Sequence, residues 1–355
     1  MSALPTTKAP LVWLLMGRKA GDNNQLLALA EKLPWPFQCK QMHYRSFEII
    51  TNLLLGVTLA GLDRQHCSDL SAPWPDLVLT AGRRNEPVAR WIKQQSGGKT
   101  RLVHLGRPWA PLAAFDLLVT TPQYFLPEQE NILHNQLPLH RVNEAAIASA
   151  VNAWQVELEA FPRPRIAVLL GGNSGPYTFT AAAAQKMGQL VNQLARQQQA
   201  SLLISSSSRT PVSAFHAFER EIDVPSYFYR WHQDDQHNPY LAYLGTADSF
   251  VVTGESMSML TEAAATGKPL FIYNFANRSL PWWCYWSNYR FNALVHRLAM
   301  KIGPKRMRRD IGNIQRNLVA SGRALILGEA SAATKTAVIT DDLARTVERV
   351  KQLLS

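Results

Sequence analysis

The sequence contains little of what builds disulfide frameworks or metal sites. Its 355 residues include only three cysteines, Cys39, Cys67 and Cys284, which are far apart and never in CxxC spacing. This usage argues against a disulfide framework and a structural zinc site, and it favours a reducing compartment. No Asp-x-Asp pair occurs, which disfavours enzymes that bind Mg²⁺ through such a pair. We therefore predict a protein without a metal ion or a cofactor.

Long apolar runs and acidic residues are scarce as well. The longest apolar run, around residues 53–62, is interrupted by Gly56, Thr58 and Gly61 and is shorter than the about 20 residues that cross a bilayer. Residues 1–10 lack the apolar core of a signal peptide. We therefore expect a cytoplasmic protein, soluble or peripheral on the inner face of the cytoplasmic membrane. The formal net charge of +11 favours anionic partners.

What the chain does contain is an alternation of apolar strands and amphipathic helices. Strands that alternate with helices form parallel sheets covered on both faces, and a length of 355 residues favours two domains. We predict an α/β protein of two Rossmann-like, doubly wound parallel-sheet domains facing a cleft. The predicted strands are 11–16, 76–80, 101–105, 116–120, 165–170, 201–205, one around 227, 249–252 and 270–273.

Prolines mark the predicted boundary between the two domains. The segment Pro162-Arg163-Pro164 ends a predicted helix over 143–161, because proline cannot continue a helix and restrains the residue before it. We therefore predict an N-terminal domain over residues 1–161 and a C-terminal domain over 162–335. Residues 336–355 have the spacing of a helix, which we expect to pack back on the N-terminal domain.

The most informative stretch is residues 248–273, which reads as strand, tight turn, helix, Gly-Lys-Pro stop and strand. The turn places small hydroxyl residues and free backbone N–H groups at the start of a helix, which suits phosphate. Glu262 follows on the second turn of the helix and can face the same ligand. A phosphate cradle beside a carboxylate suits a nucleoside diphosphate, with the carboxylate on the ribose hydroxyls. The expected contacts are Gly254, Glu255, Ser256, Met257, Ser258 and Glu262.

Two more loops follow strands in the same half of the chain. In Gly171-Gly172-Asn173-Ser174-Gly175 the glycines would let backbone N–H groups approach an anion closely. This loop matches neither the dinucleotide fingerprint nor the P-loop. The loop 205–211 holds Ser206 and Arg209, and Arg209 would stabilise a departing diphosphate. Alternatively, the serines of this loop only cap the next helix, with Pro211 at its start.

The first half of the chain carries a candidate general base. Asp22 lies in the loop 17–25, just before a predicted helix, and would deprotonate an acceptor hydroxyl. Alternatively, Asp22 only caps that helix. Paired arginines after the second strand would clamp phosphate or carboxylate, unless they form a solvated face. The expected acceptor-binding residues are Arg18, Lys19, Asn24, Gln25, Arg83, Arg84 and Arg107.

Aromatic and basic residues gather late in the second half of the chain. Such aromatics are often core, but beside basic residues they suit a membrane surface with anionic headgroups. Single-stranded nucleic acid uses similar ingredients, but the chain has no recognisable nucleic-acid module, so we favour the membrane. Residues 234–237 are predicted to form a solvated turn rather than a metal site. The residues of the aromatic and basic patch are Trp282, Trp283, Trp286, Lys305, Arg306, Arg308 and Arg309.

Taken together, these motifs resemble the ELM-type "mitochondrial fission" family, some of whose members are described as glycosyltransferases. The matching segments are 17–25, 75–84, 96–108, 119–124, 171–174 and 254–268. The second half is similar, more distantly, to the donor lobe of GT-B glycosyltransferases, such as the lipid-linked N-acetylglucosamine transferase of peptidoglycan synthesis. There a Gly-Gly-Ser-x-Gly loop and a helix-borne glutamate serve the nucleotide sugar. Glu262 matches that glutamate, and Asn173 replaces the loop serine. Asp22 looks like the base aspartate of heptosyltransferases.

The resemblance implies a metal-independent, inverting GT-B glycosyltransferase. It would move a sugar from a nucleotide diphosphate sugar to a hydroxyl of an anionic, lipid-linked cell-envelope glycan of the lipopolysaccharide kind. Asp22 would take the acceptor proton, and Arg209 with the N–H groups of residues 256–258 would stabilise the leaving diphosphate. Two alternatives remain open. One is a nucleotide-sugar 2-epimerase, and the other is a non-catalytic recruitment protein at a membrane.

Overall fold

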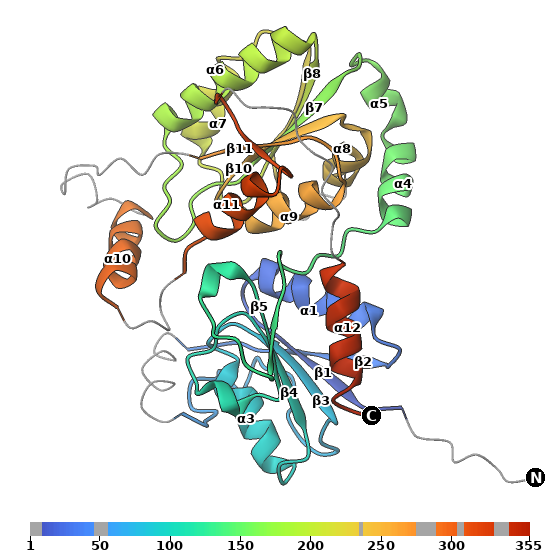
Figure 1. Ribbon diagram of the computed structural model, residues 1–355, viewed down its shortest axis with the longest axis vertical. Coiled ribbons are helices and arrows are strands. Elements are labelled where there is room, and N and C mark those ends of the chain that lie inside the picture. Colours follow the sequence, from blue (N-terminus) through green and yellow to red (C-terminus); the bar gives the residue numbers. More distant parts are fainter. Residues whose placement is uncertain (1–8, 46–55, 234–236, 275–288, 304–308, 330–340) are drawn as a thin grey trace, which may run out of the picture. The chain divides into compact units, whose positions relative to one another are not determined.

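The computed structural model describes residues 9–45, 56–233, 237–274, 289–303, 309–329 and 341–355 (Figure 1). The chain forms two compact units. The N-terminal unit comprises Met1–Arg141 together with Thr340–Ser355, and the C-terminal unit comprises Val142–Ile339. In the described part of the chain, no helix is both long and apolar enough to cross a membrane.

The N-terminal unit is built on a six-stranded parallel sheet in the order β2-β1-β3-β4-β5-β6. The strands are β1 (Val12–Met16), β2 (Phe37–Gln41), β3 (Leu77–Ala81), β4 (Arg101–Leu105), β5 (Leu117–Thr120) and β6 (Ile132–His134). Helices α1 (Ala20–Lys32) and α12 (Asp342–Lys351) pack on one face, and α3 (Glu86–Gln95) packs on the other. The central strands β1 and β3 are buried at every position, and all their residues except Thr80 are apolar, because both faces of the sheet are covered.

The C-terminal unit has a second six-stranded parallel sheet, in the order β12-β11-β10-β7-β8-β9. Numbered from its own first strand, this order is 3-2-1-4-5-6 read from the β9 edge, as in the dinucleotide-binding folds. The strands are β7 (Arg165–Leu170), β8 (Ser201–Ser206), β9 (Ser226–Tyr229), β10 (Ser249–Thr253), β11 (Leu270–Tyr273) and β12 (Leu325–Ile326). The predicted fold class, two Rossmann-like doubly wound parallel-sheet domains, is confirmed.

Helices cover both faces of this second sheet (Figure 1). Helices α6 and α7 pack on one face, and α8 and α9 lie across the sheet from them. The helices are α4 (Glu144–Ala153), α5 (Gln155–Glu159), α6 (Ala181–Gln198), α7 (Val212–Glu219), α8 (Tyr240–Thr246), α9 (Met257–Ala265), α10 (Tyr289–Ile302) and α11 (Gly312–Ala320). Two 3₁₀ turns, Leu112–Ala114 and Pro122–Tyr124, belong to the N-terminal unit.

The division between the units differs from the predicted boundary at residues 161 and 162. It falls between Arg141 and Val142, because α4 packs against α8 of the C-terminal unit. The contact is close: a Cβ added at Gly245 would lie 2.4 Å from Val151 and 2.6 Å from Ile147. The proline segment 162–164 therefore follows helices α4 and α5 but does not separate the two units.

The chain returns to the N-terminal unit at its C-terminal end. The Asp342 carboxylate accepts the N–H groups of Gln136 and Leu137 at 2.7 and 3.0 Å. Asn135 donates to the Thr346 hydroxyl at 3.0 Å. Val347 and Val350 join the apolar core beside α1. Helix α12 is thus an integral part of this unit's core.

Candidate functional site

The candidate site of the C-terminal unit lies at the carboxyl ends of β10, β7 and β8. These strands are neighbours in the sheet, and the strand order reverses between β7 and β10. In open α/β sheets, ligands bind outside the carboxyl ends at this switch point. The three loops singled out in the sequence, 171–177, 207–211 and 254–256, all leave the sheet here.

The loops after β7 and β8 are bonded to each other. The Thr210 hydroxyl donates to the carbonyls of Leu170 and Gly171, and the Ser207 hydroxyl also donates to Gly171 at 2.9 Å. A Cβ added at Gly172 would lie only 2.0 Å from the Arg209 carbonyl oxygen. Glycine is therefore required at Gly172 by the close approach of the neighbouring loop.

The backbone amides of the glycine loop are not free, which corrects the sequence-based interpretation of how this loop works. We expected the N–H groups of Gly171, Gly172, Asn173 and Ser174 to face a ligand anion. Each instead donates within the protein, and the acceptors are, in order, Thr253 Oγ1, Glu255 Oε1, the Arg209 carbonyl and the Tyr177 carbonyl, at 2.8, 2.5, 3.1 and 3.0 Å. The place expected for a ligand anion is taken by the protein's own Glu255 carboxylate.

Arg209 is held over this buried carboxylate. Its Nη2 lies 3.8 Å from Glu255 Oε1 and donates to the Ser256 hydroxyl at 3.4 Å, while Nη1 donates to the Asn173 carbonyl at 3.2 Å. The Glu255 side chain is 0% exposed, whereas that of Arg209 is 39% exposed. The Arg209 guanidinium is therefore accessible to a ligand while it contacts the loops after β7 and β10. Glu255 is buried beside it and can contact a ligand only through Arg209.

Burial dominates the chemistry of Glu255. It raises the pKa of this carboxyl to about 7, against the lowering effects of the Gly172 N–H, Arg209 and the Thr253 hydroxyl. Among the described residues, none donates a hydrogen bond to Oε2, which is buried. The ordinary pKa is 4.5, so the folded state holds this proton at pH values where the unfolded state has released it.

We expect Glu255→Gln to stabilise the protein at pH 8 and to make little difference at pH 4. A pKa raised from 4.5 to about 7 corresponds to roughly 3 kcal/mol of stability, present below the unfolded pKa and lost as pH rises through the folded one. Glutamine mimics the protonated carboxyl at every pH. Thermal unfolding of both proteins between pH 4 and pH 8 measures the difference. Equal melting temperatures at pH 8 would contradict the assignment.

Helix α9 begins beside Arg209 with an open N-terminus. Ser256 is its N-cap, but the side chain makes no capping hydrogen bond and instead accepts from Arg209. None of the described residues accepts the N–H groups of Met257, Ser258 or Met259. Unbonded N–H groups and the helix dipole both favour an anion at such an end. Gly254 precedes this turn because a Cβ there would lie 2.5 Å from Gln315.

Glu262 lies on the same face of α9 as the exposed Ser258, one turn further along. Its Oε2 accepts a hydrogen bond from the Tyr240 hydroxyl of α8. Burial raises the pKa of Glu262, and the Tyr240 hydrogen bond opposes this. Burial, followed by the Glu262 charge, raises the pKa of Tyr240. Tyr240 thus orients the carboxylate and engages only one of its oxygens. Tyr240 was not predicted from the sequence.

The Ser206 hydroxyl, predicted to bind the nucleotide sugar, is hydrogen-bonded within the protein. It accepts the N–H of Trp231 at 2.9 Å, and the residue is buried at the end of β8. The hydroxyl therefore connects β8 to the segment that follows β9. Asn173 is similar, because its side-chain oxygen accepts the N–H of Phe179 at 2.9 Å.

The N-terminal unit has its own switch point, between β1 and β3. Asp22 lies there in the first turn of α1, and a Cβ added at Gly82 would lie 3.1 Å from its Oδ2. Helix α1 begins at Ala20 with Lys19 as N-cap, so the helix starts earlier than predicted and Asp22 lies in its first turn and not at the cap. None of the described residues hydrogen-bonds its carboxylate, so the structure offers no capping role for it.

The polar residues around Asp22 divide into structural and exposed groups. Asn23 closes the loop by exchanging two hydrogen bonds with the backbone of Gly17, at 2.9 and 2.8 Å. Gln25 donates to the Gly21 carbonyl at 3.4 Å. The exposed polar residues near the start of α1 are Arg18, Lys19 and Asn24.

The loops after β3 and β4 are joined through a buried carboxylate that the sequence analysis assigned no role. Glu86 accepts the N–H groups of Trp109 and Ala110, each at 2.9 Å, and burial raises its pKa to about 7. The exposed Arg83 guanidinium lies 4.6 Å from the centre of the Trp109 ring. Arg84 is half-buried. Glu86 therefore positions the Trp109 ring on which Arg83 rests.

The Arg107 guanidinium is hydrogen-bonded to the backbone of a neighbouring turn. Its Nη1 donates to the carbonyls of Tyr124 and Phe125 at 2.7 and 3.1 Å. Phe125 has a left-handed φ of 52°, an uncommon conformation for a bulky residue. The guanidinium therefore holds this turn in place, and its contacts give less support to acceptor binding than those of Arg83.

Part of the predicted aromatic and basic patch lies outside the described residues, namely Trp282, Trp283, Trp286, Lys305, Arg306 and Arg308. Arg309 is described and half-buried. Residues 234–236 also lie outside. Within the described ranges, no cluster of His, Cys, Asp and Glu could hold a metal ion.

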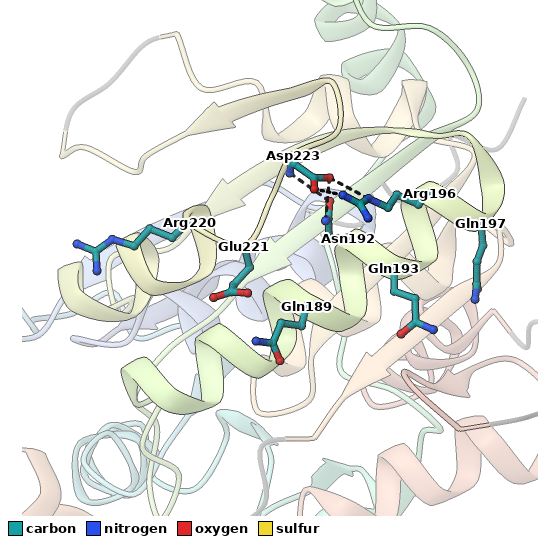
Figure 2. A pocket seen from close by; sticks show the side chains of 8 residues that line it. All are labelled: Gln189, Asn192, Gln193, Arg196, Gln197, Arg220, Glu221 and Asp223. Atoms are coloured by element: carbon teal, nitrogen blue, oxygen red, sulfur yellow. Dashed lines mark hydrogen bonds and ion pairs between the residues drawn. The ribbon is translucent and has the colours of Figure 1, made fainter.

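A polar groove of about 490 Å³ lies elsewhere on the C-terminal unit (Figure 2). Its lining comes from the second half of α6 and the segment after α7, which lead into the amino ends of β8 and β9. Arg196 and Asp223 in it are already paired. The groove therefore lies at the amino ends of the strands, whereas the candidate loops leave their carboxyl ends. Its lining residues are Gln189, Asn192, Gln193, Arg196, Gln197, Arg220, Glu221 and Asp223.

Residues 20–302 match the family described as mitochondrial fission ELM1. The chain belongs to this family. It is 25% identical over 321 residues to the uncharacterized protein RP120 of Rickettsia prowazekii (strain Madrid E), covering 82% of this chain and 87% of that protein. It is 26% identical over 221 residues to the mitochondrial fission protein ELM1 of Arabidopsis thaliana, covering 56% of this chain and 51% of that protein.

Among solved structures, this ELM1-family protein is similar to a glycosyltransferase from Rickettsia africae ESF-5. The sequence identity is 9%, the TM-score is 0.46, and the match covers 98% of this chain and 100% of that one. The family resemblance found in the sequence is confirmed by the family match.

Proposed function

We propose that this ELM1-family protein is a glycosyltransferase whose C-terminal unit binds a nucleotide diphosphate sugar. One observation carries the proposal. At the switch point of one sheet, a helix N-terminus with unbonded N–H groups, a half-exposed arginine and a tyrosine-bonded glutamate occur together. The helix N-terminus and the arginine suit the negative charges of a diphosphate. The glutamate suits the hydroxyls of a ribose.

The diphosphate would be held by Arg209 and by the N–H groups at the start of α9. A guanidinium presents donors in a geometry that fits phosphate oxygens, and a helix N-terminus adds partial positive charge. Both would favour the charge that develops on a departing diphosphate. We therefore propose that the reaction needs no metal ion. The glycine loop contributes by packing against the loop that carries Arg209.

The ribose would be recognised by Glu262. Tyr240 holds one carboxylate oxygen, and the other would accept hydrogen bonds from the ribose diol. Because Ser258 and Glu262 share one face of α9, a diphosphate at the helix start would place its nucleoside along this face.

The acceptor would be activated by Asp22. The acceptor hydroxyl oxygen attacks the anomeric carbon, its proton passes to the Asp22 carboxylate, and the bond from that carbon to the diphosphate oxygen breaks. The electron pair of this bond leaves with the diphosphate. A single displacement inverts the anomeric centre. The exposed cations Arg18, Lys19 and Arg83 favour an anionic acceptor, and we propose a lipid-linked cell-envelope glycan.

A thermal-shift screen in the presence of EDTA tests this function. The panel consists of UDP-, GDP-, CDP- and ADP-sugars and the matching nucleoside monophosphates. We expect one base to raise the melting temperature with increasing concentration, by mass action, and its diphosphate sugar to do so far more than its monophosphate. If no diphosphate compound shifts the transition, or if a shift requires Mg²⁺, the proposal is wrong.

A further inference from the structure

Helix α10, orange in Figure 1, carries an apolar stripe that the described residues of its own unit leave exposed. Leu294, Val295, Leu298 and Ile302 are 37, 50, 55 and 71% exposed. Leu294, Leu298 and Ile302 lie four residues apart, and Val295 lies three residues before Leu298, so the four form one side of the helix. Ala293, next to the stripe in sequence, is fully buried. The helix therefore has an inner side packed on the protein and an outer apolar side.

The charges of α10 all have one sign. The helix contains Arg290, Arg297 and Lys301 and no aspartate or glutamate. Arg297 Nε donates to the Pro176 carbonyl at 3.2 Å, which holds the helix to the loop after β7. Lys301 is exposed and directly precedes Ile302. The outer side of α10 therefore combines aliphatic side chains with positive charge.

We propose that the outer side of α10 docks on an anionic membrane surface. A helix with an apolar side and only cationic charges suits the boundary between headgroups and acyl chains, where Lys301 can reach lipid phosphates. The net charge of +11 adds long-range attraction to such a surface. A protein partner would more often present mixed charges to pair with, and α10 has no carboxylate to offer it. The stripe is short, so the contact is reversible and needs both lipid charge and apolar insertion.

Vesicle co-sedimentation of the full chain tests this surface. We expect binding to phosphatidylcholine vesicles that contain phosphatidylglycerol, little binding to pure phosphatidylcholine, and a decrease at high salt. Leu298→Asp combined with Ile302→Asp should lower the partition coefficient at least about tenfold, because two apolar insertions become two like charges. Lys301→Gln should lower it about fivefold, the effect of one cation near an anionic surface.

Val156→Asp is the matched control. Val156 is 81% exposed on α5 of the same unit, so the change adds a charge at an exposed valine away from the stripe and should leave vesicle binding unchanged. Each variant should keep the wild-type melting temperature. Wild-type binding to neutral vesicles as tight as to anionic ones, or an unchanged double variant, overturns the proposal. So does a wild-type dimer that the double variant converts to a monomer, because the stripe would then be a self-association face. The result does not depend on nucleotide binding, which the thermal-shift screen measures separately.

Discussion

Asp22→Asn is expected to leave donor binding unchanged and to lower kcat by about 10²- to 10⁴-fold, the usual contribution of a positioned general base. Asparagine keeps the shape of the side chain opposite Gly82 but cannot take a proton. The Asp22 carboxylate has no hydrogen-bond partner among the described residues, so its removal should not disturb the fold.

Sugar transfer from a radiolabelled donor to a membrane lipid fraction measures this effect, with donor affinity determined separately. Asp69→Asn is the control, because Asp69 is an exposed aspartate of the same unit. A variant at Asp22 that transfers sugar at the wild-type rate would remove this residue from the mechanism. A variant that no longer binds donor would show that Asp22 acts in binding.

Arg209→Ala is expected to weaken binding of the nucleotide diphosphate sugar and to lower kcat by about 10²- to 10³-fold, as loss of one charge-stabilising donor does elsewhere. Binding of the nucleoside alone should change little, because Glu262 is on a different element. Isothermal titration with diphosphate and nucleoside separates the two contributions.

The substitution at Arg209 also removes the cation beside buried Glu255, and an unpaired buried charge is costly. We therefore pair it with Glu255→Gln in a double variant, which should fold like wild type and still bind diphosphate poorly. Arg220→Ala is the control, because Arg220 lines the groove at the amino ends of the strands. Wild-type diphosphate affinity in the double variant would place the phosphate elsewhere.

Most of the fold is predictable because buried parallel strands are largely apolar runs. Strands β3, β4, β5, β7, β8 and β10 were all predicted in this way. Strands β2, β6 and β12 were not predicted. Strand β2 is an edge strand whose residues Phe37–Gln41 are partly or largely exposed, so it lacks an apolar run, and β6 and β12 have only three and two residues. The boundary was misplaced because the packing of α4 on α8 leaves no local signal, whereas proline does.

The site was predictable as a set of residues but not as a set of contacts. The glycine pair 171–172 and Glu255 were identified, yet a pattern of glycines does not reveal whether the group that approaches closely is a ligand or the protein itself. Tyr240 and Glu86 were missed because each acts on an element distant in sequence. Tyr240 reaches Glu262 from α8, and Glu86 reaches the loop after β4 from α3.

The most direct test is a crystal structure of the protein with the nucleoside diphosphate selected by the thermal-shift screen, grown in EDTA. We expect phosphate oxygens within hydrogen-bonding distance of the Arg209 guanidinium and of the N–H groups at the start of α9, and ribose hydroxyls bonded to Glu262. A nucleotide bound in the α6 groove, or one whose phosphates contact neither Arg209 nor α9, would contradict it.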